Sequence, residues 1–202
     1  MTQDKTGRIE IPDFPVVNFT VRIVGRTPLI ANRFGESAIA KLEGSQQKKA
    51  AHRLDARDPE QEFEEGRYRM SDGRDGFPAA SIKKAIKAAA VRMTELKGTE
   101  VVAAFNIEAT DNGLLAIDGP APKMRTDHVV RVGRGNVAYR PEYWPWAIDV
   151  PVSLFTPTLG VAEFLNLLRN AGFGIGVGNW RPEKGGSSGT FDIDPAIKVE
   201  QD

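Results

Sequence analysis

Two stretches with the apolar spacing of an amphipathic helix, each lying between strand-like runs, constrain the fold of this chain most strongly. In the first, apolar side chains recur three or four positions apart; they are Ile82, Ile86, Ala89, Ala90 and Met93. In the second they are Val161, Phe164, Leu165 and Leu168. Such a stripe lets a helix bury one face while its other face stays in water. The sequence therefore predicts two helices that pack against a common apolar surface.

Strand signals precede and follow both helices. Residues 17–24 and 146–155 alternate apolar and polar side chains, the pattern of a half-buried strand, although Pro151 pushes the second run toward an edge or a bulge. Residues 101–109 and 114–117 flank Asn112-Gly113, and Asn-Gly between two apolar runs predicts a hairpin. Residues 191–199 predict a last strand.

This order of elements predicts an α+β fold of the ferredoxin-like or RRM-like (split βαβ) kind, an antiparallel sheet with two helices on one face. Two segments fall outside the pattern: a charged insertion after the first strand, at about residues 36–76, and a central β-ribbon at residues 123–140. We expect one domain over residues 1–202 with the insertion as an arm. Residues 46–57 suit a short basic helix and residues 58–65 hold five acids, so this arm either contacts partners or is a solvated loop.

Composition excludes several classes of protein. Lys+Arg 27 balances Asp+Glu 27, so no overall field draws the chain onto nucleic acid or an anionic membrane, and a polyanion site has to be a local patch. The absence of cysteine rules out disulfides, thiolate catalysis and cysteine-based metal sites. Neither a secretory signal nor a run of about 20 apolar residues is present. We therefore expect a soluble, cytoplasmic protein that does not bind membranes.

A glycine-rich segment, residues 172–189, separates the second helix from the last strand. Its spacing fits neither a dinucleotide fingerprint nor a Walker loop. Glycines allow a phosphate or another backbone to approach, so the segment is either a binding loop or a flexible surface hairpin. Trp180 and Arg181 favour binding, because an aromatic plane beside a guanidinium suits an unpaired base and its phosphate.

The ribbon carries a second basic signal. Its cations are Lys123, Arg125, Arg131, Arg134 and Arg140, against Asp127 alone, for a local net charge of +4. Gly133 and Gly135 flank Arg134, and Tyr139, Tyr143, Trp144 and Trp146 follow. Basic and aromatic side chains together suit an unpaired strand. Tyr143, Trp144 and Trp146 are alternatively core or interface aromatics.

The start of the first helix and the glycine-rich segment resemble a known family. Phe77-Pro78-Ala79-Ala80-Ser81-Ile82-Lys83-Lys84-Ala85-Ile86-Lys87 looks like the start of the first helix in the repeat-associated mysterious proteins of CRISPR systems, and the glycine-rich loop is similar to that superfamily's other hallmark. The Cas7-like branch fits best, since its members also carry a long insertion after the first strand and an extra ribbon. Arg-Val-Gly-Arg-Gly-Asn and Asn-Trp-Arg-Pro-Glu-Lys-Gly resemble segments of stand-alone phage and prophage proteins.

The resemblance implies an RRM-like core that binds single-stranded nucleic acid along its backbone, often as a row of identical subunits. Carried over by position, the side chains that would face phosphates are those of Ser81, Lys83, Lys84 and Lys87. The glycines that would approach the strand are Gly174, Gly176 and Gly178.

Three functions follow, in order of preference. The first is non-catalytic binding of single-stranded DNA or RNA by a self-assembling homo-oligomer or filament, without cofactor or metal. Its phosphate contacts would come from Lys83, Lys87, Arg125, Arg131, Arg134 and Arg181, with stacking by Trp180 or Tyr139, and six contacts give a log–log salt slope of about −4. The second is a phage structural or interaction protein, or a mimic that docks on a host nucleic-acid-guided complex. The third is a metal-independent ribonuclease that uses His128 as a general base. The sequence holds one other histidine, His52.

Overall fold

The computed structural model describes residues 13–33, 58–131 and 134–196, and for residues 129–131 and 134–136 it describes the backbone but not the side chains. The main sheet has four strands, β1 (Val16–Gly25), β5 (Phe105–Ile107), β9 (Ala147–Phe155) and β10 (Phe191–Ile193). Their order is β10-β1-β9-β5 and every neighbouring pair is antiparallel. Numbered along the chain, this is the 4-1-3-2 order of a ferredoxin-like sheet, and the expected fold class is confirmed.

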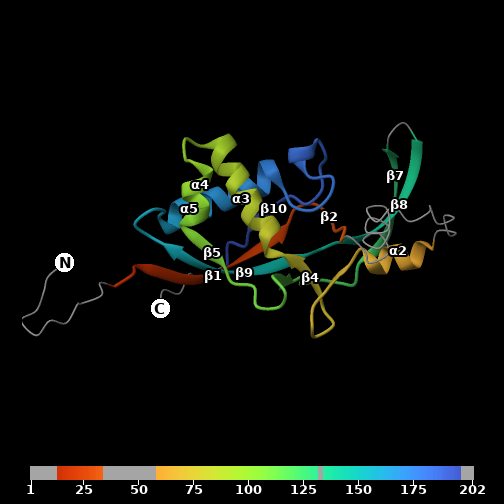
Figure 1. Cartoon of the computed structure of the whole chain (residues 1–202), viewed down its shortest axis with the longest axis horizontal. Helices are drawn as coiled ribbons and strands as arrows, with labels where there is room; N and C mark the ends of the chain where they lie inside the picture. Colours follow the sequence, from red (N-terminus) through yellow and green to blue (C-terminus); the bar gives the residue numbers. More distant parts are fainter. Residues whose placement is uncertain (1–12, 34–57, 132–133, 197–202) are drawn as a thin grey trace, which may run out of the picture.

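Two long helices cover one face of this sheet (Figure 1). Helix α3 (Ala79–Met93) connects β1 to β5 through further elements, and α5 (Val161–Asn170) lies between β9 and β10. The predicted alternation of β1 holds, because Phe19, Val21 and Ile23 are buried beneath the helices. The stripe of α3 is buried from Ile82 to Ala90, whereas Met93 at the helix end is 42% exposed.

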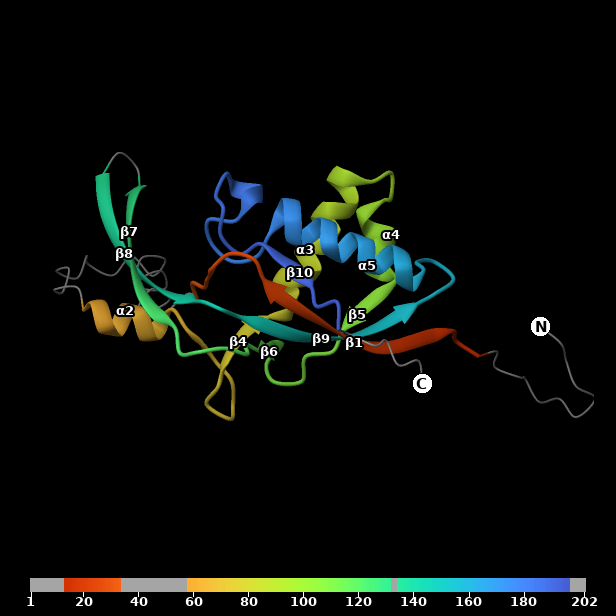
Figure 2. The same ribbon diagram turned by 180° about the vertical axis from the view of Figure 1, so that it is seen from behind.

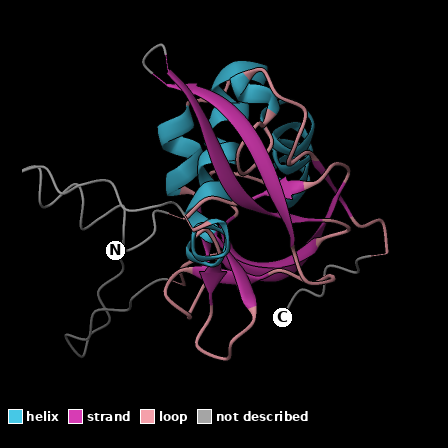
Figure 3. Cartoon of the chain, turned by 90° about the vertical axis from the view of Figure 1, so that its right-hand side faces the viewer, coloured by secondary structure: helices cyan, strands magenta, loops and turns pink. Residues whose placement is uncertain are grey.

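Two small sheets extend from this core. One has the order β2-β8-β7 and contains β2 (Leu29–Ile30), β7 (Lys123–Arg131) and β8 (Arg134–Tyr143). The other has the order β3-β4-β6 and contains β3 (Tyr68–Arg69), β4 (Asp75–Pro78) and β6 (Leu114–Ala116). The β7–β8 ribbon projects from one end of the molecule (Figure 2), and seen from that end it lies in front of the helices (Figure 3).

The predicted hairpin around Asn112-Gly113 is wrong, because the strands on its two sides do not pair with each other. Both residues have positive φ, 51° and 73°, so the tight turn itself is present. However, β5 pairs with β9 and β6 pairs with β4, so the strands on either side of the turn belong to different sheets. The first part of the predicted strand is instead helix α4 (Gly98–Ala103), whose buried Val101 belongs to the main core.

Pro151 is in a central strand, not at an edge or bulge. Its carbonyl accepts from Glu108 N, so its own nitrogen faces the β5 side of β9. The pairing of β5 stops one residue earlier, at Ile107 opposite Val152. Proline has no N–H to donate, and at position 151 β9 is no longer paired with β5, so its absence breaks no bond of the β5–β9 ladder.

Of the arm expected at about residues 36–76, the structure describes residues 58–76. Residues 34–57, which include His52 and the predicted basic helix, lie outside the described residues. The acidic residues that follow form helix α2 (Pro59–Glu65): Asp58 caps it by accepting from Glu60 N and Gln61 N at 3.0 and 3.2 Å, and Phe63 is buried. Strands β3 and β4 follow and join the body of the protein through β6.

Within the described residues, no helix is both long and apolar enough to cross a membrane.

Candidate functional site

A groove of about 370 Å³ lies where the start of α3 meets the glycine-rich segment. Its walls come from four parts of the chain: the residues after β2, the β3–β4 hairpin, the first two turns of α3, and residues 175–183. Five of the residues that the sequence singles out meet here: Ser81, Lys84, Gly176, Gly178 and Arg181. Tyr68, Phe77 and Asn179 line the same groove.

The α3 wall of the groove favours anions. Its N-cap is Pro78, which makes no side-chain hydrogen bond to the helix, and no acid occupies the first turn. The free N–H groups and the dipole of a helix start attract negative charge. Ser81 and Lys84 are three positions apart and so lie on one side of the helix. Lys84 is exposed and has neither an ion pair nor a hydrogen bond to any described residue.

The glycines of the opposite wall serve close packing of the loop. Gly178 has φ 75°, and a Cβ there would lie 2.6 Å from the carbonyl oxygen of Ile30. This close approach lets Asn179 N donate to Ile30 O at 2.8 Å, while Val177 N donates to Gly189 O at 2.9 Å. The loop is thus bonded to β2 and to itself, which does not fit a flexible surface hairpin. Gly174 packs near the thioether of Met93 and is not part of the groove.

Arg181 lies in the groove but its guanidinium is already bound. It donates to Glu183 Oε2 at 2.9 and 2.7 Å and to Gly178 O at 3.0 Å. Arg92 of α3 pairs with the other oxygen of Glu183 at 3.0 Å. Burial alone would raise the pKa of Glu183, but the bonds from Arg181 and the nearby cations outweigh it and lower that pKa. Arg181 therefore stabilises the loop, whereas the sequence predicts that it contacts a phosphate.

Two of the expected phosphate contacts on α3 lie away from the groove. Lys83 Nζ donates to Phe105 O at 2.9 Å and to Asn106 Oδ1 at 3.2 Å, and it lies 5.1 Å from the centre of the Phe105 ring. It thereby fastens α3 to the edge strand β5. Lys87 is exposed one turn further along and its side chain passes close to Gly98 of α4. Neither lysine lines the groove, although Lys87 is three positions from Lys84 and therefore near it on the helix surface.

The ribbon is less basic than its residues 123–140 suggest. Arg125 donates to Asp127 Oδ1 and to Glu142 Oε2, both at 2.7 Å, and Arg140 donates to Asp127 Oδ2 at 2.9 Å. Counting Glu142, which β8 also carries, lowers the ribbon's formal net charge from +4 to +3. The side chains of Arg131 and Arg134 lie outside the described residues.

The two stacking candidates are separated. Trp180 is 44% exposed and its indole N–H donates to Asp127 Oδ2 at 3.2 Å, so it lies on the face of the ribbon that carries Asp127. Tyr139 pairs with Thr126, and neighbouring positions along a strand face opposite sides. Tyr139 therefore points from the other face, as does His128, which is exposed. Of the alternative core aromatics, Tyr143 and Trp146 are buried, whereas Trp144 is 47% exposed.

Asn179 is the residue that the sequence reasoning missed. The nitrogen of its side-chain amide is buried at the groove and has no hydrogen-bond partner within the described residues. Such an unpaired donor is unusual in a folded protein and indicates a place for an acceptor. The one signal in the sequence for Asn179 was its position between the glycines and Trp180-Arg181. Tyr68 was missed because it lies in the segment taken for an arm.

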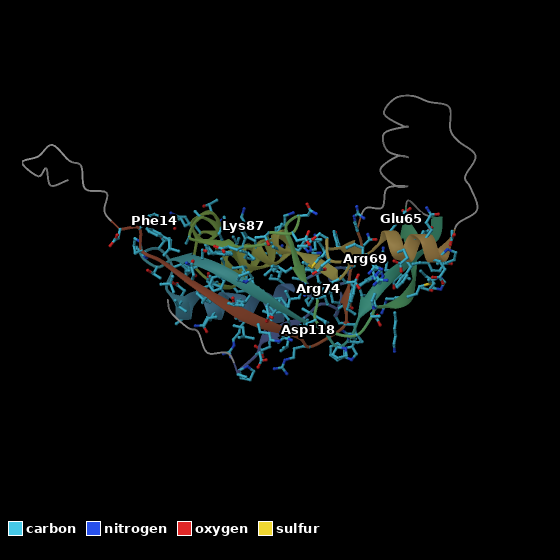
Figure 4. All side chains as sticks on the ribbon, turned by 90° about the horizontal axis from the view of Figure 1, so that it is seen from below. Phe14, Glu65, Arg69, Arg74, Lys87 and Asp118 are labelled. Carbon is cyan, nitrogen blue, oxygen red and sulfur yellow. The ribbon has the colours of Figure 1, made fainter. Side chains whose placement is uncertain are left out.

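A second cavity of about 540 Å³ is lined by four arginines and three aspartates, and every one of these arginines is ion-paired. Of these residues, Arg69, Arg74 and Asp118 are visible from below the sheet (Figure 4). Arg67 binds Asp75 at 2.7 Å, and Arg22 binds both Asp118 and Asp149. Because these groups neutralise one another, the cavity lacks the excess of donors found in the groove. In the described part of the chain, no group of three or more histidine or acidic side chains could hold a metal ion.

Comparison with known proteins adds little to this description. No protein-family model and no curated protein matches the chain. Among solved structures, one similar chain belongs to the cryo-EM structure of the type III-B Cmr-beta bound to cognate target RNA, with 13% sequence identity and a TM-score of 0.44. The match covers 92% of this chain and 60% of that chain. A likeness at this level decides neither fold nor function, and the resemblance to repeat-associated mysterious proteins stays a sequence-based prediction.

Proposed function

We propose that this chain binds single-stranded nucleic acid without catalysis, and that the groove beside α3 holds the sugar–phosphate backbone. The observation that carries the proposal is the convergence of unpaired donors in one groove. They are Lys84 and the side-chain amide of Asn179, with the Ser81 hydroxyl and the start of α3, which no side chain caps, beside them. Phosphate oxygens are the acceptors that such a set of donors fits.

The aromatic neighbours favour a nucleotide over a bare phosphate. The half-buried ring of Tyr68 lines the groove, and the exposed ring of Trp180 stands beside it, whereas Phe77 in the groove wall is buried. Unpaired bases stack on such rings with little regard to sequence. A duplex usually needs a broader basic surface, whereas the net charge of this chain is zero.

The test removes Lys84 and compares the result with a matched change on the same helix. Binding of labelled single-stranded DNA and RNA oligonucleotides is measured over a range of salt concentrations for the wild type, Lys84→Gln and Lys87→Gln. Both variants lose one exposed cation, but only Lys84 lies in the groove. We expect Lys84→Gln to weaken binding about five- to tenfold, since a charge-assisted hydrogen bond is lost, and to reduce the log–log salt slope by about 0.7.

Two results would overturn the proposal: no binding of either polymer by the wild type at low salt, or equal binding by the two variants. Cleavage of labelled RNA that disappears in His128→Ala would instead support the ribonuclease.

The second candidate, an interaction protein, is favoured by exposed aromatic side chains outside the groove. Phe14, Trp144 and Phe173 are 73%, 47% and 81% exposed. Self-assembly, which belongs to both proposals, would cover such side chains. Light scattering separates the two: an interaction protein forms a concentration-dependent oligomer whose mass does not change with added oligonucleotide.

A further inference from the structure

Asp127 is the one charged residue that is buried within the described part of the chain; it is 6% exposed. It accepts from Arg125 Nε at 2.7 Å, Arg140 Nη1 at 2.9 Å and Trp180 Nε1 at 3.2 Å. The arginines come from the ribbon, and the tryptophan comes from the glycine-rich segment 53 positions away. A buried carboxylate is costly unless its oxygens are bonded, and here both are. Asp127 therefore joins two parts of the fold that are otherwise separate in sequence.

The backbone at Trp180 is shaped for this contact. Trp180 has φ 55°, a left-handed conformation that a bulky residue rarely adopts. Its carbonyl accepts from Ser188 N at 2.9 Å, and a Cβ on Gly186 would lie 1.8 Å from that carbonyl oxygen. The rest of the loop thus fixes the peptide of Trp180, and the strained residue reaches Asp127 with its indole. Such strain persists only where surrounding contacts hold it, and it often marks a functional position.

The position of Trp180 relates the groove to the ribbon. Its neighbours Asn179 and Arg181 line the groove, while Trp180 itself bonds to the ribbon. Arg125 and Arg140 are opposite each other in the register and share a face with Asp127. Arg125 is 41% exposed. The exposed part of the Trp180 ring therefore lies between the donors of the groove and a partly exposed arginine of the ribbon.

We propose that Asp127 is a positioning residue that joins the groove and this face of the ribbon into one continuous track for a single strand, with Trp180 between them. The inference rests on the proposed function, since it concerns how far the bound strand extends. A strand that leaves the groove stacks a base on Trp180 and places the next phosphate near Arg125. Without the bond to Asp127, Trp180 loses its hold on this face of the ribbon, although the loop stays bonded to β2, and the strand keeps only its groove contacts.

An electrostatic role and a positioning role of Asp127 predict opposite effects of Asp127→Asn on binding. Removing an acid from a nucleic-acid-binding surface strengthens electrostatic attraction, so a merely electrostatic role predicts tighter binding. A positioning role predicts weaker binding of long strands. Asp192→Asn is the matched control, because Asp192 also pairs with two arginines away from the groove, accepting from Arg26 at 2.7 Å and lying 3.5 Å from Arg169. Trp180→Phe keeps an aromatic plane but removes the indole donor and part of the ring area, with Trp144→Phe as its control.

The experiment measures binding of a trinucleotide and of a twelve-residue strand to each variant. Asp127→Asn and Trp180→Phe are expected to weaken the long strand about five- to tenfold and leave the trinucleotide within about twofold, with both controls unchanged or slightly tighter. Hydrogen exchange of residues 176–189 in the free protein should accelerate in these two variants and in neither control.

Several outcomes would overturn the track. It fails if Asp127→Asn binds the long strand as tightly as Asp192→Asn, or if Trp180→Phe matches Trp144→Phe. A wild type that binds the trinucleotide but gains nothing from the longer strand also refutes the track while leaving the groove proposal intact. A wild type that binds neither refutes the proposed function itself.

Discussion

Replacing Gly178 with alanine is expected to lower the free energy of unfolding by about 3 kcal/mol. A left-handed conformation costs a non-glycine residue about 1–2 kcal/mol, and Gly178 has φ 75°. The new Cβ would lie 2.6 Å from Ile30 O and 2.9 Å from Leu29 Cδ1, so the loop has to move away from β2. That movement breaks the bond from Asn179 N to Ile30 O, which contributes about 1 kcal/mol more.

Gly185→Ala separates the clash from the backbone strain. Gly185 has φ 79°, but no atom lies within 4 Å of its virtual Cβ, so only the conformational cost of about 1–2 kcal/mol applies. Urea denaturation followed by circular dichroism gives both free energies, and calorimetry should show Gly178→Ala melting about 6–12 °C below the wild type. Equal losses of stability in the two variants would refute the claim that close packing on β2 requires glycine at position 178.

Two further predictions concern the carboxylates. Asp58→Ala should lower the free energy of unfolding by about 1 kcal/mol through loss of the α2 cap, measured by denaturation, and unchanged hydrogen exchange in residues 59–65 would contradict it. On acidification, burial would raise the pKa of Asp127, but bonds from Arg125, Arg140 and Trp180 lower it overall, and bonds from Arg26 lower the pKa of Asp192. Groups with a lowered folded pKa contribute stability that is complete above the ordinary carboxyl pKa of about 4 and is lost as the pH falls through the folded value. Melting temperatures recorded from pH 6 to pH 2 should therefore fall below about pH 4, and less steeply in Asp127→Asn; a flat profile would count against these ion pairs.

The main sheet and its helices could be predicted from sequence because their signals are periodic. The alternation in β1 and the stripe from Ile82 to Ala90 correspond to buried faces. The same reasoning failed after α3, where an apolar run and an Asn-Gly turn read as a hairpin. A turn signal fixes the local backbone, but strand partners depend on which sheet edge is nearby, and that is a tertiary property.

The candidate site was predicted in part for a similar reason. Ser81 and Lys84 meet because helical spacing places them together. The pairing of Arg125 with Asp127 was also open to prediction, since positions i and i+2 of a strand share a face. By contrast, the contact of Asp127 with Trp180 spans 53 positions, and no local pattern carries it. Of the expected phosphate ligands, Arg181 is bound by Glu183 two positions away, whereas Lys83 is bound by Phe105, 22 positions away.

Ion pairing between arginines and acids explains how a chain without net charge can still offer a site for a polyanion. Most arginines of the described core bind acids, so they add little to the field beyond their own contacts. Lys84 and the side-chain amide of Asn179 remain unpaired, and the fold brings both to one groove beside the start of α3. Affinity at such a site comes from a few short contacts and little from long-range attraction. The log–log salt slope for binding should then be much shallower than the value of about −4 that six phosphate contacts give, because Arg181 and Lys83 are already bound within the protein. A measured slope of about −4 would mean instead that Arg181 and Lys83 leave their partners within the protein and contact phosphates when the strand binds.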